Sequence, residues 1–249
     1  MSKRFGINII VTIYIWLITF ISLTITYLII LVGSPILDSS QNRYIFENIG
    51  IKFIYMCVKL ANIWKIRIID QRKFKEKNTQ YIIISNHISL IDGLLLLYIH
   101  KNKIGYVAKK FGTIPILSGI LKSCNYTLIA KEDPSTTNGV VNNTISLLNK
   151  DPKLSLFLFP EGKRNSNPNQ MLKFKTGGFR ISMETNIPIL PVTIIGSDKA
   201  HSIGSWLFNP SKIKIIIGKP IFPSKYNKLQ TFIKNVKISI SDNYKNFNI

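Results

Sequence analysis

The chain has 249 residues, which is enough for one α/β domain with a substantial core and a smaller appendage. Its 33 Lys and Arg residues against 12 Asp and Glu residues give a formal net charge of +21. This charge has two interpretations: an anionic partner, either a nucleic acid or a membrane surface, or a general bias of the residue usage toward Lys. The two cysteines, Cys57 and Cys124, have no metal-ligand spacing, so the sequence predicts free buried thiols in a reducing compartment and no metal site.

The N-terminal segment is the most apolar part of the chain. Residues Ile7 to Val32 include no charged side chain. A helix of that length reaches about 39 Å, more than the roughly 30 Å of a bilayer's hydrocarbon core. Gly33-Ser34-Pro35 then ends the helix without a small-residue cleavage site. We therefore expect a retained membrane anchor rather than a cleaved signal peptide.

A second apolar stretch, Ile51 to Trp64, follows a polar segment, Asp38 to Arg43, that we expect to form a turn. The stretch has only 14 residues and carries Lys52 and Lys59. Its length and charge are typical of an interfacial amphipathic helix rather than of a membrane span.

Two membrane topologies remain open. Lys3 and Arg4 favour a cytoplasmic N-terminus, so a single full span would place the rest of the chain on the far side of the membrane. A hairpin that re-enters would keep both ends in the cytoplasm, and this is the preferred interpretation. Residues 1–65 would then form a membrane-anchoring helical segment, integral or monotopic, and residues 66–249 a cytoplasmic catalytic domain.

From about residue 66 onward, short β-branched runs alternate with longer mixed segments. The predicted strands are residues 81–84, 105–108, 126–130, 154–159, 189–195 and 212–217, and the predicted helices are residues 90–98, 137–150 and 224–242. This alternation predicts an α/β layered domain with a mainly parallel sheet flanked by helices. In such sheets, active groups gather where strands end and loops begin.

His87 follows the first predicted strand, and Asp92 lies five residues later, at the start of the predicted helix. This spacing can return a carboxylate to the imidazole across a strand–helix turn. The carboxylate would fix the ring tautomer and leave the other nitrogen free to remove a proton from an alcohol. Taken alone, the pattern has a competing structural explanation, in which Ser89 and Asp92 cap the helix and His87 is an ordinary loop residue.

The segment Phe159-Pro160-Glu161-Gly162-Lys163-Arg164 follows the fourth predicted strand and suits an anion site. Gly162 permits close approach to the backbone, and Arg164 can hold a phosphate through two parallel hydrogen bonds. Arg164 and Arg180 are the only arginines after residue 72 in a chain that otherwise uses Lys, which argues that Arg164 is not an interchangeable surface cation. The alternative is a solvated basic loop.

A third motif, Ile187-Pro188-Ile189-Leu190-Pro191-Val192, restricts the entry to a strand and alone indicates only structure. Together, the motifs over residues 66–222 resemble those of the lysophosphatidic acid acyltransferase family, the bacterial PlsC type of 1-acyl-glycerol-3-phosphate acyltransferase. Asn86-His87-x-Ser89-x-x-Asp92 is similar to the family's His-x4-Asp block. Ala108-Lys109-Lys110, followed by Ile114-Pro115 and Gly119, is similar to a further block.

The resemblance implies a role for each matched residue. His87 would be the catalytic base and Asp92 its partner. The implied substrate-binding residues are Lys109, Lys110, Glu161, Gly162 and Arg164, and the residues implied to shape the acyl pocket are Pro188 and Pro191. Lys163 and Lys131 stand where the family usually has Thr and Arg, which affects the acceptor contacts more than catalysis.

The resemblance also implies the reaction. A membrane acyltransferase of this kind moves a fatty acyl group from acyl-CoA or acyl carrier protein to the sn-2 hydroxyl of 1-acyl-glycerol-3-phosphate, giving phosphatidic acid, with no metal or other cofactor. Its expected partners are the lysophospholipid, the acyl thioester, anionic membrane lipids and acyl carrier protein, and no nucleic acid. Two alternatives stay open: a related acyltransferase acting on glycerol-3-phosphate or another lysophospholipid, and a basic membrane-surface protein without catalysis.

Overall fold

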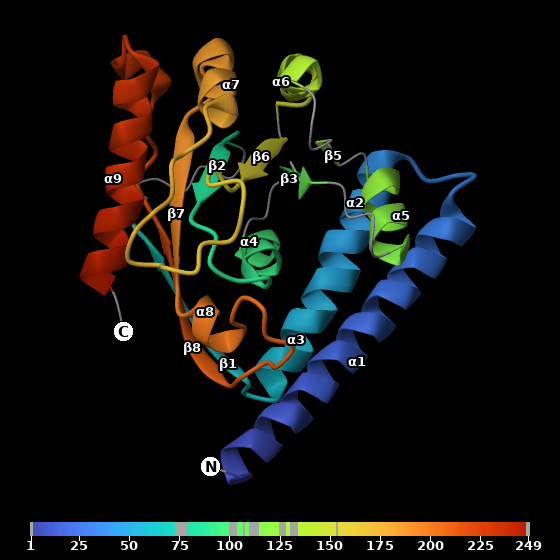
Figure 1. The fold of residues 1–249 in the computed structure, drawn as a ribbon. Helices are drawn as coiled ribbons and strands as arrows, with labels where there is room; N and C mark the ends of the chain where they lie inside the picture. Colours follow the sequence, from blue (N-terminus) through green and yellow to red (C-terminus); the bar gives the residue numbers. More distant parts are fainter. Residues whose placement is uncertain are drawn as a thin grey trace.

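A six-stranded sheet forms the centre of the protein (Figure 1), in a computed structural model that describes residues 2–72, 79–99, 104–106, 108–109, 115–124, 128–129, 134–152 and 154–247. The strand order is β1-β8-β7-β2-β6-β3, and only the β7–β8 pair is antiparallel. The strands are β1 (Trp64–Asp70), β2 (Ile82–Ser85), β3 (Ile104–Tyr106), β6 (Ser155–Leu158), β7 (Ile189–Ile195) and β8 (Ser211–Ile217). The predicted α/β class with a mainly parallel sheet is confirmed.

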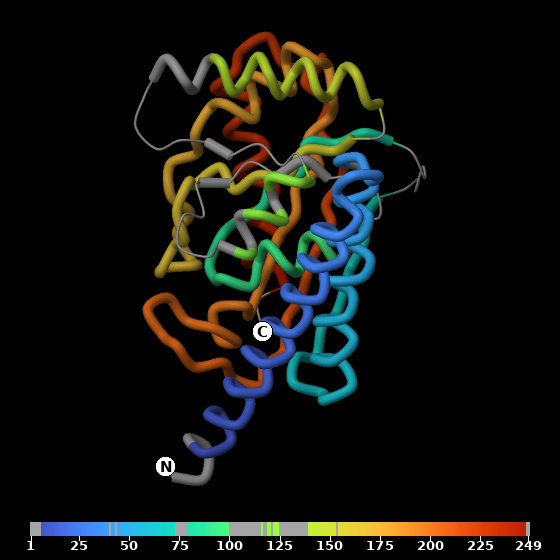
Figure 2. The backbone as a smooth tube through the Cα atoms, turned by 90° about the vertical axis from the view of Figure 1, so that its right-hand side faces the viewer, coloured from blue at the N-terminus to red at the C-terminus, as the bar shows by residue number. Residues whose placement is uncertain are grey.

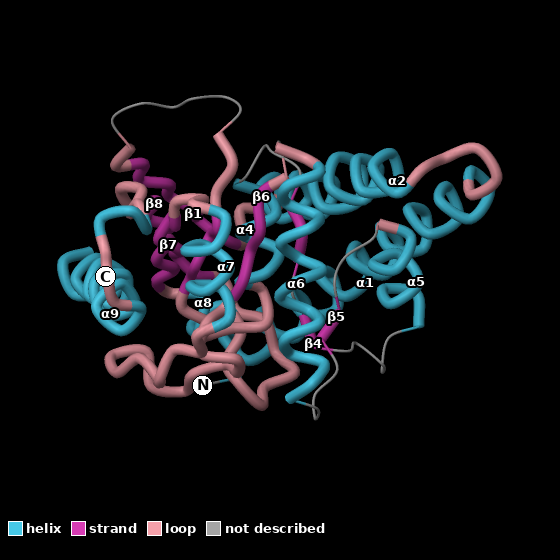
Figure 3. The backbone as a smooth tube through the Cα atoms, turned by 90° about the horizontal axis from the view of Figure 1, so that it is seen from above, coloured by secondary structure: helices cyan, strands magenta, loops and turns pink. Residues whose placement is uncertain are grey.

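Helices cover both faces of this sheet (Figures 1 and 3). On one face lie α4 (Asp92–Ile99) and the N-terminal helices, and on the other lie α6 (Pro134–Lys150), α7 (Gly177–Thr185) and α9 (Leu229–Phe247). The central strands are buried on both sides, so their residues alternate between two cores. Ile83 and Leu190 face the α4 side, whereas Ile82 and Ile189 face the α7 and α9 side.

The N-terminal segment folds back along itself (Figure 2). Helix α1 (Ser2–Gly33) is followed by α2 (Ser39–Ile45), a π-helical turn (Phe46–Ile51) and α3 (Lys52–Leu60), and this returning arm packs against α1. The predicted turn at Asp38 to Arg43 is wrong, because the side chains of Asp38 and Gln41 exchange hydrogen bonds with each other's backbone N–H and so start α2 as a capping box.

One face of α1 belongs to the protein core. Ile15 and Ile18 join the same cluster as the central strands, and the Thr12 hydroxyl accepts a 2.8 Å hydrogen bond from the backbone N–H of Phe208. Farther along, the Ser22 hydroxyl donates to the Gly50 carbonyl at 2.8 Å. The opposite face carries exposed apolar side chains, which include Ile10, Ile13, Leu17, Phe20, Leu28 and Val32. Gly6 to Gly33 is long and apolar enough to cross a membrane.

Several predicted boundaries change. The second apolar stretch ends as a helix at Leu60, and Trp64 instead begins β1, a strand that we did not predict. The predicted helix 137–150 already begins at Pro134, and the predicted helix 224–242 becomes α9, preceded by a short 3-10 turn at Pro223–Lys225.

The middle of the chain contributes a second, two-stranded sheet of β4 (Ala108–Lys109) and β5 (Leu128–Ile129). The predicted strand 105–108 is therefore divided between two sheets. Helix α5 (Pro115–Ser123) lies between β4 and β5 in the chain and packs against α1. Gly119 makes this approach possible, because a Cβ there would lie 2.8 Å from the ring of Tyr27.

Candidate active site

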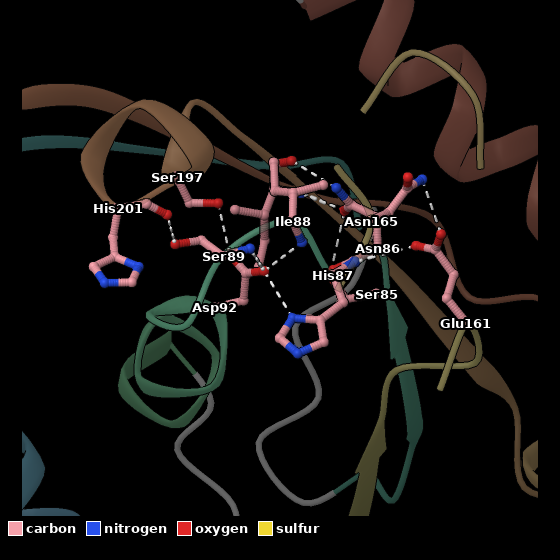
Figure 4. Close-up of polar contacts among 11 residues, drawn as sticks. Ser85, Asn86, His87, Ile88, Ser89, Asp92, Glu161, Asn165, Ser197 and His201 are labelled. Carbon is pink, nitrogen blue, oxygen red and sulfur yellow. Dashed lines mark hydrogen bonds and ion pairs between the residues drawn. The ribbon is translucent and has the colours of Figure 1, made fainter. Parts of the chain in front are cut away.

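His87 and Asp92 meet at the carboxyl edge of the sheet (Figure 4). The imidazole Nδ1 lies 2.9 Å from Oδ2 of Asp92, the first residue of α4. The Asp92 side chain is fully buried, whereas the His87 side chain is 19% exposed. Because an ionised carboxylate only accepts hydrogen bonds, Nδ1 carries the proton and Nε2 is left as the proton acceptor of the ring.

The same carboxylate oxygen also caps the turn before α4. Oδ2 of Asp92 accepts hydrogen bonds from the backbone N–H of Ile88 at 2.7 Å and of Ser89 at 2.8 Å. The carboxylate therefore contacts both the imidazole and the capping turn, whereas the Ser89 hydroxyl donates to the His201 carbonyl and does not cap the helix. The turn that brings the carboxylate back to the imidazole is held by that carboxylate.

The imidazole ring of His87 also stacks on Phe159. Their ring centroids are 3.8 Å apart and the planes differ by only 9°. Phe159 follows strand β6, so the neighbouring strand supports one face of the ring. Stacking and the Asp92 hydrogen bond together hold the ring in one orientation.

The end of β7 and the segment after it are hydrogen-bonded to the His87 loop. The side-chain amide of Asn86 makes two 2.8 Å hydrogen bonds to the backbone of Ile194, one as donor and one as acceptor. The Ser89 hydroxyl donates to the His201 carbonyl at 2.8 Å, and the Ser197 hydroxyl donates to Oδ1 of Asp92 at 2.6 Å. The ends of β2 and β7 are thus joined by side chains.

Glu161 lies in the adjacent loop and is buried. Its Oε1 accepts the backbone N–H of His87 at 3.2 Å, and its Oε2 accepts Nδ2 of Asn165 at 3.1 Å and the backbone N–H of Leu172 at 2.9 Å. The backbone N–H of Asn165 donates in return to the His87 carbonyl at 2.7 Å. With both oxygens occupied, this carboxylate ties two loops together, which differs from the substrate contact that the resemblance implies.

The predicted anion loop presents its cations to solvent. Lys163 and Arg164 are exposed, and no carboxylate in the described part of the chain pairs with Arg164. Gly162 has a φ of +69°, which favours glycine, and a Cβ there would lie 2.9 Å from Nζ of Lys175. The loop therefore presents three positive side chains beside the His87 loop.

His201 is a buried histidine near this loop. Its Nδ1 has no hydrogen-bond partner within the described residues, and its ring lies 4.5 Å from that of Phe208. Burial, and then the positive charge of Arg164, lowers the pKa of His201 below its usual value. His201 is therefore neutral near pH 7.

The predicted acyl-pocket prolines belong to the β7 segment. Pro191 is in the middle of β7, and Pro188 precedes that strand, where its carbonyl accepts the backbone N–H of Ile82 at 3.0 Å. A small cavity on the α4 side is lined by Leu190 and Val192, which alternate with Pro191, together with Arg72, Ile83, Leu96, Ile99 and Ile217. Lys109 is in β4, and Lys110 lies outside the described residues.

Sequence reasoning gave no role to Phe159, although it begins the predicted anion segment, and it missed Asn165, Ser197 and His201. Asn165 directly follows that segment, so its position was a usable signal. Ser197 is 105 residues from Asp92 in the chain, and no local pattern indicates that they meet.

The acyltransferase family profile matches residues 65–195. The chain is 28% identical to the chloroplastic 1-acyl-sn-glycerol-3-phosphate acyltransferase LPAT1 of Arabidopsis thaliana over 212 residues, which cover 84% of this chain and 58% of that protein. It is 33% identical to the 1-acyl-sn-glycerol-3-phosphate acyltransferase of Helicobacter pylori over 120 residues, which cover 47% of this chain and 49% of that protein. The chain thus spans little more than half the length of the Arabidopsis relative.

The fold is also similar to a solved structure. The crystal structure of the 1-acyl-sn-glycerophosphate acyltransferase PlsC from Thermotoga maritima matches with a TM-score of 0.79. The match covers 98% of this chain and 97% of that chain at 20% sequence identity, so the likeness is one of fold. It includes the N-terminal helices as well as the sheet.

Because Glu161 joins two loops through three donors, its loss should cost stability. We expect Glu161→Ala to lower the free energy of unfolding by about 3 kcal/mol, since it leaves buried backbone and amide donors unpaired. Glu184→Ala is the matched control, because Glu184 is 48% exposed in an i,i+4 pair with Arg180. Denaturant unfolding in detergent measures both, and equal losses would contradict the bridging role.

Proposed function

Because the chain belongs to the acyltransferase family, whose profile covers more than half of it, we propose that it transfers a fatty acyl group from an acyl thioester to the sn-2 hydroxyl of 1-acyl-glycerol-3-phosphate, forming phosphatidic acid. The observation that carries this proposal is the imidazole of His87, which is hydrogen-bonded at Nδ1 to Asp92 and is partly exposed. The relatives named above support the choice of acceptor.

The chemistry is a direct transfer with His87 as general base. Nε2 takes the proton of the acceptor hydroxyl while the oxygen attacks the thioester carbonyl carbon. The tetrahedral intermediate collapses as the carbon–sulfur bond breaks, and the imidazolium returns the proton to the leaving thiolate. Asp92 stabilises the imidazolium between the two steps, and backbone N–H groups are expected to stabilise the oxyanion. These steps balance without a metal or another cofactor.

The acceptor's phosphate would bind at the loop that carries Gly162. Arg164 offers a planar fork with no carboxylate partner among the described residues, and Lys163 and Lys175 add charge beside it. Glu161 would act indirectly, because its hydrogen bonds hold this loop against the backbone of His87. Lys109 and Lys110 are further candidates for the phosphate, as the resemblance implies.

The acyl donor and the acceptor's remaining groups are less constrained. Acyl-CoA and acyl carrier protein present the same thioester to His87, so either can serve the proposed chemistry. Glycerol-3-phosphate or another lysophospholipid would use the same His87–Asp92 pair. For the acyl chain, the resemblance implies Pro188 and Pro191, which lie just before β7 and within it.

For localisation, we propose that α1 attaches the protein to one leaflet of a membrane. One face of α1 packs against the protein at Thr12, Ser22 and Ile30, so lipid would contact only the opposite, apolar face. The net charge of +21 would add attraction to anionic lipids. This arrangement keeps the catalytic domain on the cytoplasmic side.

The central test is transfer of labelled acyl chains. We expect the purified chain to acylate 1-acyl-glycerol-3-phosphate, with acyl-CoA and acyl carrier protein tried as donors and glycerol-3-phosphate and other lysophospholipids as competing acceptors. His87→Ala should lower kcat by about 10²–10⁴-fold, because the general base is lost. Thermal unfolding and vesicle binding of the variant should stay unchanged. Near wild-type turnover in His87→Ala would exclude the mechanism.

The phosphate role of Arg164 predicts a selective change. Arg164→Lys keeps the charge but loses the fork, so the acceptor KM should rise by about tenfold while the donor KM changes little. Arg180→Lys is the control, since Arg180 is also exposed but lies on α7 beside Glu184. A similar effect on both substrates would refute the assignment.

Membrane attachment is testable on the exposed face of α1 without disturbing its buried face. Leu17→Asp with Phe20→Asp should lower partitioning to vesicles by at least tenfold, since each substitution removes roughly 1.5–3 kcal/mol of apolar transfer. Ile238→Asp, on the exposed side of α9, is the control. High salt should release the double variant from anionic vesicles but leave the wild type bound. Equal binding of the double variant and the wild type would exclude attachment through this face.

A further inference from the structure

Ser197 lies at the point where β7 ends beside the active site. Gly196 has a φ of +84°, a conformation that favours glycine, and it turns the chain so that Ser197 begins the short helix α8 (Ser197–Ala200). The Ser197 side chain is fully buried, and its hydroxyl donates a 2.6 Å hydrogen bond to Oδ1 of Asp92 (Figure 4). Charge-assisted O–H hydrogen bonds to carboxylates have this short length.

The two oxygens of Asp92 have different partners. Oδ2 accepts hydrogen bonds from Nδ1 of His87 and from the backbone N–H groups of Ile88 and Ser89. Oδ1 accepts a hydrogen bond from the Ser197 hydroxyl, which is its one donor among the described residues. Asp92 has no exposed surface, so water cannot replace that donor without a rearrangement. The charge and the plane of the carboxylate therefore depend on Ser197.

We propose that Ser197 is a positioning residue of the active site, the outer member of a Ser197–Asp92–His87 series. Its hydroxyl stabilises ionised Asp92 and fixes the carboxylate plane, and Asp92 in turn orients the His87 ring and sets how strongly the ring holds a proton. Ser197 does not touch the substrate. The expected effect on turnover rests on the proposed acyl transfer. The expected effect on the orientation and protonation of His87 does not depend on it.

The direction of the expected change in pH dependence follows from the charge on Asp92. Without the Ser197 hydroxyl, the carboxylate of Asp92 carries less compensated negative charge, so it stabilises the imidazolium form of His87 more strongly. The ring must then be deprotonated at higher pH before it can act as a base. The other charged groups facing this loop, Glu161 and Arg164, are the same in the wild type and the variants.

The experiment compares Ser197→Ala with a matched buried serine. Ser182→Ala is the control, because Ser182 is equally buried and donates at 2.6 Å to the Ile187 carbonyl on the far side of the sheet. For Ser197→Ala we expect the acidic limb of the pH–rate profile to move up by roughly half to one pH unit and kcat to fall by about tenfold, with the acceptor KM unchanged. Ser197→Thr, which keeps the hydroxyl, should recover the wild-type profile.

A second measurement does not need turnover. The chain has three histidines, so NMR with ring-labelled histidine can follow His87 as pH changes in the folded protein. The His87 resonance should titrate at higher pH in Ser197→Ala than in the wild type and in Ser182→Ala. If Ser197→Ala folds poorly, Ser197→Cys keeps the volume with a weak donor and should shift the titration in the same direction.

The outcomes separate the two proposals. An active wild type whose pH profile and His87 titration are unchanged by Ser197→Ala would overturn the positioning role and leave the proposed function standing. An inactive wild type with the expected NMR shift would overturn the acyl transfer and leave the Ser197–Asp92–His87 series standing. Equal losses of stability in both alanine variants, with no shift in pH dependence, would make Ser197 a structural residue only.

Discussion

The burial of the Asp92 carboxylate is the constraint on which the active site depends. An ionised carboxylate without exposed surface is stable only if hydrogen-bond donors replace the lost water. Here the donors come from the His87 ring, from the turn before α4 and from the segment after β7. One buried charge therefore draws three parts of the chain to one point, and the orientation of the imidazole follows from that convergence.

Glu161 uses the same physical device in the loop after β6. It is a second buried acid, in a chain with only 12 acidic residues, and its oxygens collect donors from the His87 backbone, Asn165 and Leu172. The two carboxylates share the loop of His87, one at its side chain and one at its backbone. The imidazole of His87 and the cationic loop with Arg164 are thus held in a fixed relation, which the proposed reaction between a hydroxyl and a thioester would need.

Local sequence patterns were enough to predict most of this fold. They could not predict contacts between residues that are far apart in the chain. The β-branched runs at 81–84 and 189–195 identified central strands because such strands are buried on both faces. Strand β1 was missed because its exposed Lys65 and Arg67 interrupt the apolar run at the sheet edge. The contact between His87 and Asp92 was predicted because the two residues are only five positions apart, whereas Ser197 was not, since only the sheet order brings it to Asp92. Glu161 was predicted as a substrate-binding residue, and neither its burial nor its hydrogen bonds to two loops could be inferred from the motif.

The hydrogen bonds along α1 limit which sequence changes this helix can tolerate. Thr12 is hydrogen-bonded to Phe208 and Ser22 to Gly50, so the helix is held at two points about ten residues apart. Inserting one residue between them would rotate one half of the helix by about 100° relative to the other. A change in the number of residues between these two points would therefore break one of the two contacts. Substitutions on the outer face of the helix leave both contacts intact.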